Sequence, residues 1–359
     1  MTPPDALVHP AHASSVADPR HVPWAVSSGS HAGAVRCEPK TVPVDVPDLA
    51  ELDSVRARLR PHLVRTPLIA AGRGARGSGT EILLKAENRQ LTGSFKARGA
   101  LAHVTALAAN GSASGVVAAS AGNHAQGVAL AARLLAWPCD VFVPANAPAA
   151  KISGAESLGA VVHRAPGGLD SAFREARDFA AASGRDLVHP FDDRDVVLGQ
   201  ASVALEILKE RPDVRTVVVP AAGGGLLAGT AVAVHAVAPW VSVVGVQPSG
   251  ARALTRSLLA GELIGSCLVD TVADGLRVSR AGALPLRWCA ALADRLITVS
   301  DEATETAMRR LAVEEGLIAE PAGAVGLAGA ERLEGPVAVV VSGGNVDPAL
   351  LGRVLGRGN

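Results

Sequence analysis

Short valine-rich segments alternate with longer alanine- and leucine-rich segments from about residue 81 to residue 342, and this alternation constrains the fold more than any other feature. The short segments predict strands at 81–87, 115–119, 140–144, 160–164, 186–189, 216–219, 241–246, 296–299 and 337–342. The longer segments predict helices at 94–107, 123–135, 149–158, 169–182 and 196–209, after the glycines at 223–225, and after Ser300. Repeated strand–helix units of this length form parallel sheets covered by helices, so we expect an α/β protein.

One long stretch without charged residues could be mistaken for a membrane segment. No Asp, Glu, Lys or Arg lies between Arg215 and Arg252, and about 20 apolar residues can span a bilayer. Pro220 and Gly223–Gly225 interrupt the stretch, which therefore predicts two buried strands joined by a glycine loop and a helix. Pro3 and Pro4 stand where a secretory signal needs a basic start and an apolar run. We expect a cytoplasmic protein.

Composition excludes several classes of partner. Lys and Arg together number 34, as do Asp and Glu, so no surplus positive charge favours nucleic acid or an anionic membrane. Aromatic residues make up 3% and Tyr is absent, which leaves few side chains for stacking nucleic-acid bases. The cysteines are far apart, without a CxxC pair, and predict neither a zinc site nor a disulfide framework: Cys37, Cys139, Cys267 and Cys289. A small-molecule partner is expected.

The N-terminal part differs from the rest of the chain. Residues 1–46 are rich in Pro, Ser, Ala and His and show neither a strand nor a helix period. We expect these residues to form a flexible extension.

Five lysines are the only candidates for a reactive amine, because Arg stays charged. Lys96 is the notable one, since it follows Phe95 near the start of a predicted apolar helix. A low local dielectric lowers the pKa of a lysine and favours an imine-forming amine. The alternative at this point is an ordinary lysine on a helix surface.

Three further turns join a predicted strand to a helix or loop, where ligands of open α/β sheets bind. Residues 120–127 contain small residues with Ser120 and Asn123, and suit a carboxylate at a helix start; the alternative is a simple helix cap. Gly223–Gly225 can wrap a phosphate with backbone amides, but they lack the GxGxxG and Walker patterns; the alternative is a tight turn. Ser342 could hydrogen-bond a ring nitrogen or merely cap a glycine turn. An amine, a carboxylate cradle, a phosphate cradle and a hydroxyl together suit pyridoxal phosphate.

Eight motifs then identify a family resemblance over residues 49–355. They are Thr66-Pro67-Leu68, Lys85-Ala86-Glu87-Asn88, Gly93-Ser94-Phe95-Lys96-Ala97-Arg98-Gly99, Ser120-Ala121-Gly122-Asn123-His124-Ala125-Gln126-Gly127, His189-Pro190-Phe191-Asp192-Asp193, Ala273-Asp274-Gly275, Glu320-Pro321-Ala322-Gly323-Ala324 and Ser342-Gly343-Gly344-Asn345. In this order they resemble the threonine/serine dehydratases (threonine ammonia-lyases), which are fold-type II pyridoxal-phosphate enzymes.

The resemblance implies a tryptophan synthase β-like fold with two open parallel-sheet domains and the cofactor between them. The large domain would comprise residues 47–91 and 191–359, and the small domain residues 92–190. It also implies a homodimer or homotetramer. Only 14 residues follow Asn345, so we expect no C-terminal regulatory domain.

The resemblance also assigns roles to residues. Lys96 would bind the cofactor aldehyde and act as the catalytic base, and Phe95 would lie against the ring. The phosphate would be held by Gly223, Gly224, Gly225 and Leu226. Asn123 would contact the ring hydroxyl and Ser342 the pyridine nitrogen. The substrate carboxylate would be bordered by Ser120, Ala121, Gly122, Asn123 and His124. The implied reaction is β-elimination from L-threonine or L-serine, giving 2-oxobutanoate or pyruvate and ammonia.

Some positions depart from the family pattern. Ala222 stands where a fourth glycine is usual and would be strained if its φ were positive. Ala322 replaces a common serine, without an obvious chemical consequence. Arg277 is a cation near the expected substrate entrance, either solvated or suited to a second carboxylate.

Other functions stay open. A dehydratase could prefer 3-hydroxyaspartate or a phenylserine. A serine racemase needs a second base where this chain has Ala121, and racemase metal ligands correspond to Gln247 and Ala253, so we expect no metal. A non-catalytic pyridoxal-phosphate-binding protein is the remaining alternative.

Overall fold

The structure is a computed structural model that describes residues 34–35, 45–72, 80–111, 114–265, 268–330, 333 and 335–356. The predicted flexible extension at residues 1–46 lies outside the described residues except for 34–35, 45 and 46, and Cys37 and Cys267 also lie outside them.

A seven-stranded sheet forms the larger layer of the molecule. Its strands, in spatial order, are β1 (Ala34–Val35), β10 (Arg295–Val299), β9 (Ser242–Pro248), β8 (Thr216–Pro220), β11 (Val337–Val340), β3 (Ile82–Lys85) and β2 (Leu68–Ala70). The five inner strands are parallel, and the edge strands β1 and β2 are antiparallel to their neighbours.

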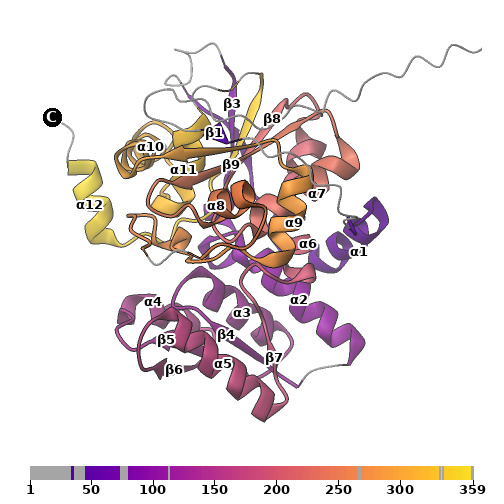
Figure 1. Cartoon of the computed structure of the whole chain (residues 1–359), viewed down its shortest axis with the longest axis vertical. Helices are drawn as coiled ribbons and strands as arrows, with labels where there is room; N and C mark the ends of the chain where they lie inside the picture. The colour runs from indigo at the N-terminus through magenta and orange to yellow at the C-terminus, as the bar shows by residue number, and fades with distance from the viewer. Residues whose placement is uncertain are drawn as a thin grey trace, which may run out of the picture.

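A second, four-stranded sheet is built from one continuous part of the chain. Its order is β6 (Val161–Ala165), β5 (Cys139–Pro144), β4 (Val116–Ala119) and β7 (Asp186–Leu187), all parallel. Figure 1 shows these strands gathered at the lower end of the view, below the larger sheet.

Helices cover both sheets. Their bounds are α1 (Leu49–Leu59), α2 (Lys96–Asn110), α3 (Asn123–Leu134), α4 (Ala149–Glu156), α5 (Leu169–Ser183), α6 (Arg194–Glu210), α7 (Gly225–Val237), α8 (Ala253–Ala260), α9 (Ala283–Leu292), α10 (Asp301–Val313), α11 (Pro321–Ala330) and α12 (Pro348–Gly356). Ser300 caps α10, because its Oγ accepts a hydrogen bond from the Ala303 amide at 3.2 Å, as the sequence predicts.

Burial on both faces explains why the strands are continuous runs of valine. In β8, Val217 and Val219 pack into one hydrophobic core, while Val218 between them packs into another on the opposite face. In β4, Val116 belongs to the same core as Val217, whereas Val117 packs with α5 on the far face. One core therefore runs continuously between the two sheets.

The α/β class with two open, largely parallel sheets is confirmed. Every predicted strand and helix is present at its expected place, with bounds that differ by a few residues. The charge-free stretch divides into β8, α7 and β9. Within the described ranges, none of the helices is both long enough and apolar enough to cross a bilayer.

Candidate active site

A large pocket opens where strands of both sheets end. Pro144 of β5 and Pro220 of β8 line it, together with Ser120, which directly follows β4, and Ser342, two residues after β11. All the residues predicted for the site line this one pocket: Phe95, Lys96, Ser120, Ala121, Gly122, Asn123, His124, Gly223, Gly224, Gly225, Leu226 and Ser342. The carboxyl ends of parallel strands are the usual ligand site of open α/β sheets.

Lys96 is the first residue of α2 and points its amine into this pocket. Its Nζ donates a hydrogen bond to the Pro190 carbonyl oxygen at 2.7 Å and lies 5.2 Å from the centre of the Phe95 ring. Burial lowers the pKa of Lys96 to about 8, against the opposing effect of the Glu320 carboxylate. The amine is therefore much easier to deprotonate than an exposed lysine.

The backbone before Lys96 is tied to the loop after β11. The Phe95 amide donates to the Ser342 carbonyl at 3.0 Å, and the Gly344 amide donates to the Gly93 carbonyl at 2.9 Å. Thr92 has a φ of +60°, a left-handed conformation that is unusual for a residue other than glycine. These contacts fix the positions of Lys96 and Ser342 relative to one another.

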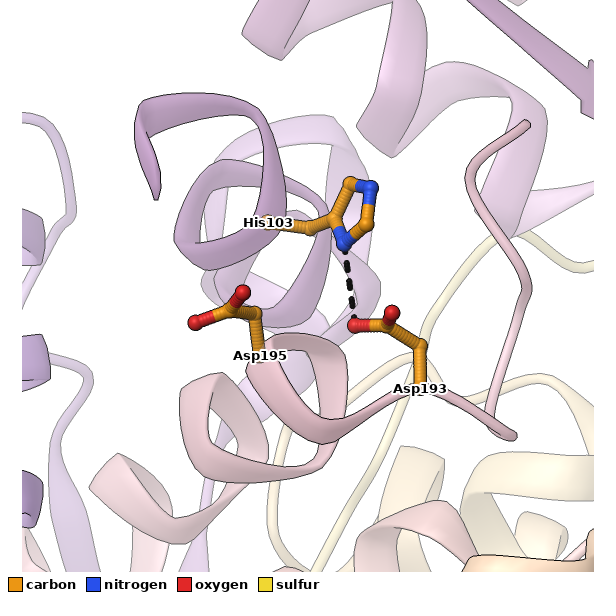
Figure 2. A group of neighbouring side chains, drawn as sticks. All are labelled: His103, Asp193 and Asp195. Atoms are coloured by element: carbon orange, nitrogen blue, oxygen red, sulfur yellow. Dashed lines mark hydrogen bonds and ion pairs between the residues drawn. The ribbon is translucent and has the colours of Figure 1, made fainter. Parts of the chain in front are cut away.

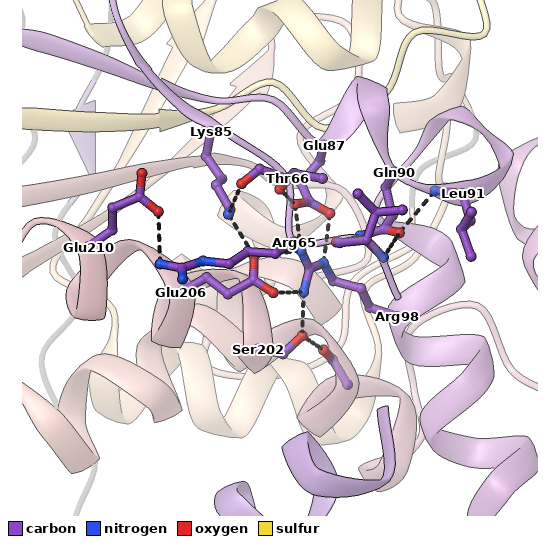
Figure 3. A network of polar contacts seen from close by, with 12 residues as sticks. Arg65, Thr66, Lys85, Glu87, Gln90, Leu91, Arg98, Ser202, Glu206 and Glu210 are labelled. Carbon is purple, nitrogen blue, oxygen red and sulfur yellow. Dashed lines mark hydrogen bonds and ion pairs between the residues drawn. The ribbon is translucent and has the colours of Figure 1, made fainter. Parts of the chain in front are cut away.

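A buried ionic network lies beneath the start of α2 (Figure 3). The Arg98 guanidinium donates to Glu87 at 2.7 and 2.8 Å and to Glu206 at 2.8 and 3.0 Å. Lys85 also donates to Glu206, at 2.6 Å, and the Thr66 hydroxyl hydrogen-bonds Glu87. The two carboxylates raise the pKa of Arg98 despite its burial. The network anchors α2 to β3 and α6.

The glycine loop at the start of α7 has the shape of an anion cradle. Gly224 caps the helix with a φ of +99°, and a Cβ at Gly223 would lie 2.5 Å from the Phe191 ring. A Cβ at Gly225 would lie 2.9 Å from the Phe191 Cβ. The first amides of a helix have no partner within the helix and lie at its positive end, so this loop suits a phosphate.

The strain considered for Ala222 is absent. Among the described residues other than glycine, a positive φ occurs only at Thr92 and Ala136. Position 222 therefore does not need glycine for its backbone conformation.

The loop at residues 120–124 provides neutral polar groups. Ser120 Oγ accepts from the Gly122 amide at 3.1 Å, and Asn123 begins α3. His124 Nε2 donates to the Val188 carbonyl at 2.8 Å. Burial, followed by the Lys96 charge, lowers the pKa of His124 to about 3, so the ring is neutral.

Ser342 presents a neutral hydroxyl to the pocket. It is buried, and its Oγ lies 3.3 Å from the Ala322 carbonyl, to which it donates. If the hydroxyl turns away from this carbonyl, it can donate its one hydrogen to a ring nitrogen, but it supplies no negative charge to hold that nitrogen protonated.

Two of the pocket residues that are missing from the predicted site set, Glu320 and His189, are buried and have strongly shifted pKa values. Glu320 Oε1 accepts from Asn123 Nδ2 at 2.6 Å, and burial, helped by the charge of Asp274, raises the pKa of Glu320 to about 7. His189 Nδ1 accepts from the Asp192 amide at 2.7 Å, and burial lowers the pKa of His189 to about 4. Both residues belong to motifs visible in the sequence, but nothing in those motifs indicates that the side chains face the pocket.

The entrance of the pocket carries charged residues from different elements. Lys151 of α4 forms an ion pair with Asp274, which begins the single-turn helix η4 (Asp274–Leu276). Arg277 lines the same pocket and is exposed, but its Nε and Nη2 donate to the Thr271 carbonyl at 2.8 and 2.5 Å. Part of the Arg277 guanidinium is therefore already engaged.

One group outside the pocket resembles a set of metal ligands: His103, Asp193 and Asp195 (Figure 2). His103 Nδ1 lies 2.9 Å from Asp193 Oδ1, and Nε2 lies 3.0 Å from Asp186 Oδ1. These carboxylates outweigh the effect of burial and raise the pKa of His103 to about 10. In the resulting imidazolium both ring nitrogens donate hydrogen bonds to carboxylates. At Gln247, where racemase metal ligands were considered, the amide oxygen accepts from Thr255 Oγ1 at 2.6 Å.

Comparisons of the sequence and of the structure with known proteins agree on one family. The profile described as "Pyridoxal-phosphate dependent enzyme" matches residues 59–343. The chain is 38% identical over 314 residues to the L-threonine ammonia-lyase of Thermotoga maritima, covering 86% of this chain and 78% of that protein. It is 34% identical over 314 residues to the serine racemase of Oryza sativa subsp. indica, covering 85% and 92%. The structure of maize serine racemase matches with a TM-score of 0.82 at 32% identity, covering 87% of this chain and 98% of that one.

Proposed function

Because the chain belongs to the family of pyridoxal-phosphate-dependent enzymes, we propose that it eliminates water from a β-hydroxy amino acid. The substrates would be L-threonine, giving 2-oxobutanoate and ammonia, and L-serine, giving pyruvate and ammonia. The observation that carries this proposal is the shared pocket: the Lys96 amine, the Gly223–Gly225 cradle and the loop at residues 120–124 all face it.

The pocket residues suit pyridoxal phosphate group by group. Lys96 would hold the aldehyde carbon, and the amides of Gly223–Gly225 and Leu226 would hold the phosphate at the start of α7. Asn123 would contact the ring hydroxyl, Ser342 the ring nitrogen, and Phe95 the ring. The bound cofactor supplies a sink for the electron pair left when the substrate α-carbon loses a proton. The two sheets support the proposed division into a small domain (92–190) and a large domain (47–91 with 191–359), with the cofactor between them.

The chain's own residues would then position the substrate and move its proton. The loop at residues 120–124 would orient the substrate carboxylate with neutral donors at the start of α3. With the substrate bound, the Lys96 amine would take the proton from the substrate α-carbon as general base. A lysine with a pKa of about 8 is suited to that task near neutral pH.

A substrate panel tests the proposal. The purified enzyme with pyridoxal phosphate is given L-threonine, L-serine, threo-3-hydroxyaspartate and a phenylserine, and oxo acid and ammonia are measured. We expect the highest kcat/KM with L-threonine or L-serine. A strong preference for the dicarboxylic substrate that is lost in Arg277→Ala would replace this proposal with a hydroxyaspartate dehydratase.

The racemase alternative is tested in the same assay by chiral analysis of serine. A serine racemase of Oryza sativa is among the similar proteins, but Ala121 has no group that can carry a proton. We expect L-serine to yield pyruvate with little D-serine. Accumulation of D-serine ahead of pyruvate would favour the racemase, and the absence of any product would favour a binding protein.

A further inference from the structure

We propose that Glu320 positions Asn123 against the cofactor's ring hydroxyl and itself gains or loses a proton near neutral pH. We further propose that the Lys151–Asp274 ion pair at the pocket entrance controls the protonation state of Glu320. The inference rests on the proposed function only in placing the ring hydroxyl against Asn123. It assigns a role to three residues that the predicted site did not include.

The first step is a chain of hydrogen bonds that fixes the orientation of Asn123. Asn345 Nδ2 donates to the Thr92 carbonyl and to Asn123 Oδ1, both at 2.7 Å. A carbonyl oxygen can only accept, so Asn345 must present its amide nitrogen at this point. Asn123 therefore accepts with Oδ1 and turns its Nδ2 toward Glu320.

The second step is what this orientation leaves available. Asn123 Nδ2 carries two hydrogens, and one is donated to Glu320 Oε1 at 2.6 Å. The other can be donated to an acceptor in the pocket, such as an ionised ring hydroxyl. Glu320 Oε2 takes part in no hydrogen bond within the described residues, and Glu320 lines the pocket. The carboxyl group thus has one oxygen that orients Asn123 and one that can hold a proton.

The fit between Glu320 and the loop after β11 is tight. Glu320 is 5% exposed, and its amide donates to the Gly343 carbonyl at 3.1 Å. A Cβ at position 343 would lie 2.1 Å from Glu320 Oε1. The absence of a side chain at Gly343 is what allows the carboxyl group to lie beside Asn123.

The third step concerns the charged groups on the neighbouring elements, which raise or lower the pKa of Glu320. Burial and the Asp274 carboxylate of η4 raise its pKa, while the Asn123 hydrogen bond, Lys151 of α4 and Lys96 of α2 lower it. The start of α11, which Glu320 precedes, also favours the ionised form. The result is a pKa of about 7, so Glu320 changes its protonation state across the neutral range.

The last step connects that balance to the entrance. Lys151 lies in α4, which connects two strands of the four-stranded sheet, and Asp274 lies in η4, which connects two strands of the seven-stranded sheet. Both side chains are partly exposed. The Gly275 amide donates to Asp274 Oδ1 at 2.8 Å and holds that carboxylate in place. If the entrance opens, Lys151 leaves and Asp274 acts on Glu320 uncompensated, which favours the protonated carboxyl. Closure would favour the ionised form.

The test follows the near-ultraviolet and visible absorbance of the holoenzyme against pH. We expect a transition with a midpoint near 7 in the wild-type enzyme. Glu320→Gln keeps an acceptor for Asn123, so it should lose this transition yet bind pyridoxal phosphate within several-fold of wild type. Asp274→Asn should move the midpoint down and Lys151→Gln should move it up, each by about 0.5 or more in pH. Asp213→Asn, which removes an equal charge from an exposed pair with Arg211, should leave the midpoint unchanged.

Three results would overturn the proposal. They are a wild-type spectrum without a transition between pH 6 and 8, a transition that persists in Glu320→Gln, and entrance variants that shift the midpoint in the same direction. The two entrance variants alter partly exposed side chains, so they test the idea even if the Glu320 variant does not fold. Oxo-acid formation by the wild-type enzyme is measured separately: opposite midpoint shifts without oxo acid would sink the proposed substrates and leave this inference standing.

Discussion

Two cations in the first turn of α2 show how differently burial can act on neighbouring charges. Arg98 is fully buried, yet it is held by Glu87 and Glu206, and its pKa is raised. Lys96, two residues earlier, donates to one carbonyl oxygen, and its pKa falls to about 8. Burial disfavours the charged form of both side chains, so the difference comes from their partners. Removal of a fully partnered buried cation leaves buried carboxylates uncompensated, whereas an under-partnered cation is available for chemistry.

The largest effect should come from removing the under-partnered cation. Lys96→Ala should lower oxo-acid formation by at least about 1000-fold, because it removes both the cofactor attachment and the general base. The absorbance of lysine-bound pyridoxal phosphate should disappear with it. Lys209→Ala, an exposed lysine on α6, is the control and should keep both. Retention of the absorbance in Lys96→Ala would mean that another lysine holds the cofactor.

Removing the fully partnered cation should damage stability instead. Arg98→Met leaves the buried Glu87 without its guanidinium and the partly buried Glu206 with only Lys85, and should lower the free energy of unfolding by about 3–5 kcal/mol in denaturant titrations. Arg98→Lys should recover only part of this loss, because an ammonium cannot reproduce the forked contacts. Arg56→Met, at an exposed pair with Asp53, should cost about 1 kcal/mol or less. If Arg98→Met lowered the free energy of unfolding by no more than Arg56→Met, the distinction between the buried and the exposed ion pair would be wrong.

His103 extends the comparison to pH, because it too is buried between carboxylates. Its pKa is raised from about 6.5 to about 10, so the folded state retains a proton that the unfolded state releases. The stabilisation is complete below pH 6.5 and is lost as the pH rises toward 10. The difference in unfolding free energy between wild type and His103→Gln should be a few kcal/mol at pH 6, about the free energy that corresponds to the rise in the pKa of His103 on folding. This difference should shrink steadily above pH 7. A difference that does not depend on pH would show that His103 acts through packing rather than charge.

Asp195 should give the smallest effect, although it stands beside the same histidine. Its carboxylate hydrogen-bonds neither nitrogen of His103, and lies 3.7 Å from the guanidinium of Arg58 at a partly exposed position. Asp195→Asn should change the free energy of unfolding by less than about 0.5 kcal/mol. A larger change, measured beside Asp193→Asn, would mean that the three side chains act as a unit.

The fold was largely predictable from the sequence because buried parallel strands have a simple signature. Valine runs such as 216–219 mark them, and the intervening helices have regular apolar patterns. Helix α11 lacks such a signal, because it is apolar on every side and starts at Pro321, so no period distinguishes it from a buried loop. Helices α8 and α9 were also not predicted. The α1 helix was also not predicted, although its buried residues Leu52, Val55 and Leu59 recur at helical spacing.

The individual residues of the candidate site were predictable from the sequence, but the contacts between them were not. Lys96, the glycine loop and Ser342 are identifiable because each lies at or just after the end of a predicted strand or near the start of a predicted helix. The Asn123–Glu320 contact and the Lys151–Asp274 pair join residues far apart in sequence, and no local pattern reports them. The concern about Ala222 arose because a backbone angle cannot be read from residue type.

The position of β11 has a consequence for the order in which the molecule assembles. The strand is formed by Val337–Val340, yet it lies between β8 and β3 and joins two otherwise separate parts of the larger sheet. The four strands of the smaller sheet all lie within residues 116–187 and can pair long before β11 is synthesised. During translation, β3 and β8 cannot be joined into one sheet until β11 has been synthesised. Because Ser342 lies two residues after β11, the pairing of this strand also brings Ser342 to the pocket, so the pocket lining is complete only after the C-terminal part of the chain has been synthesised.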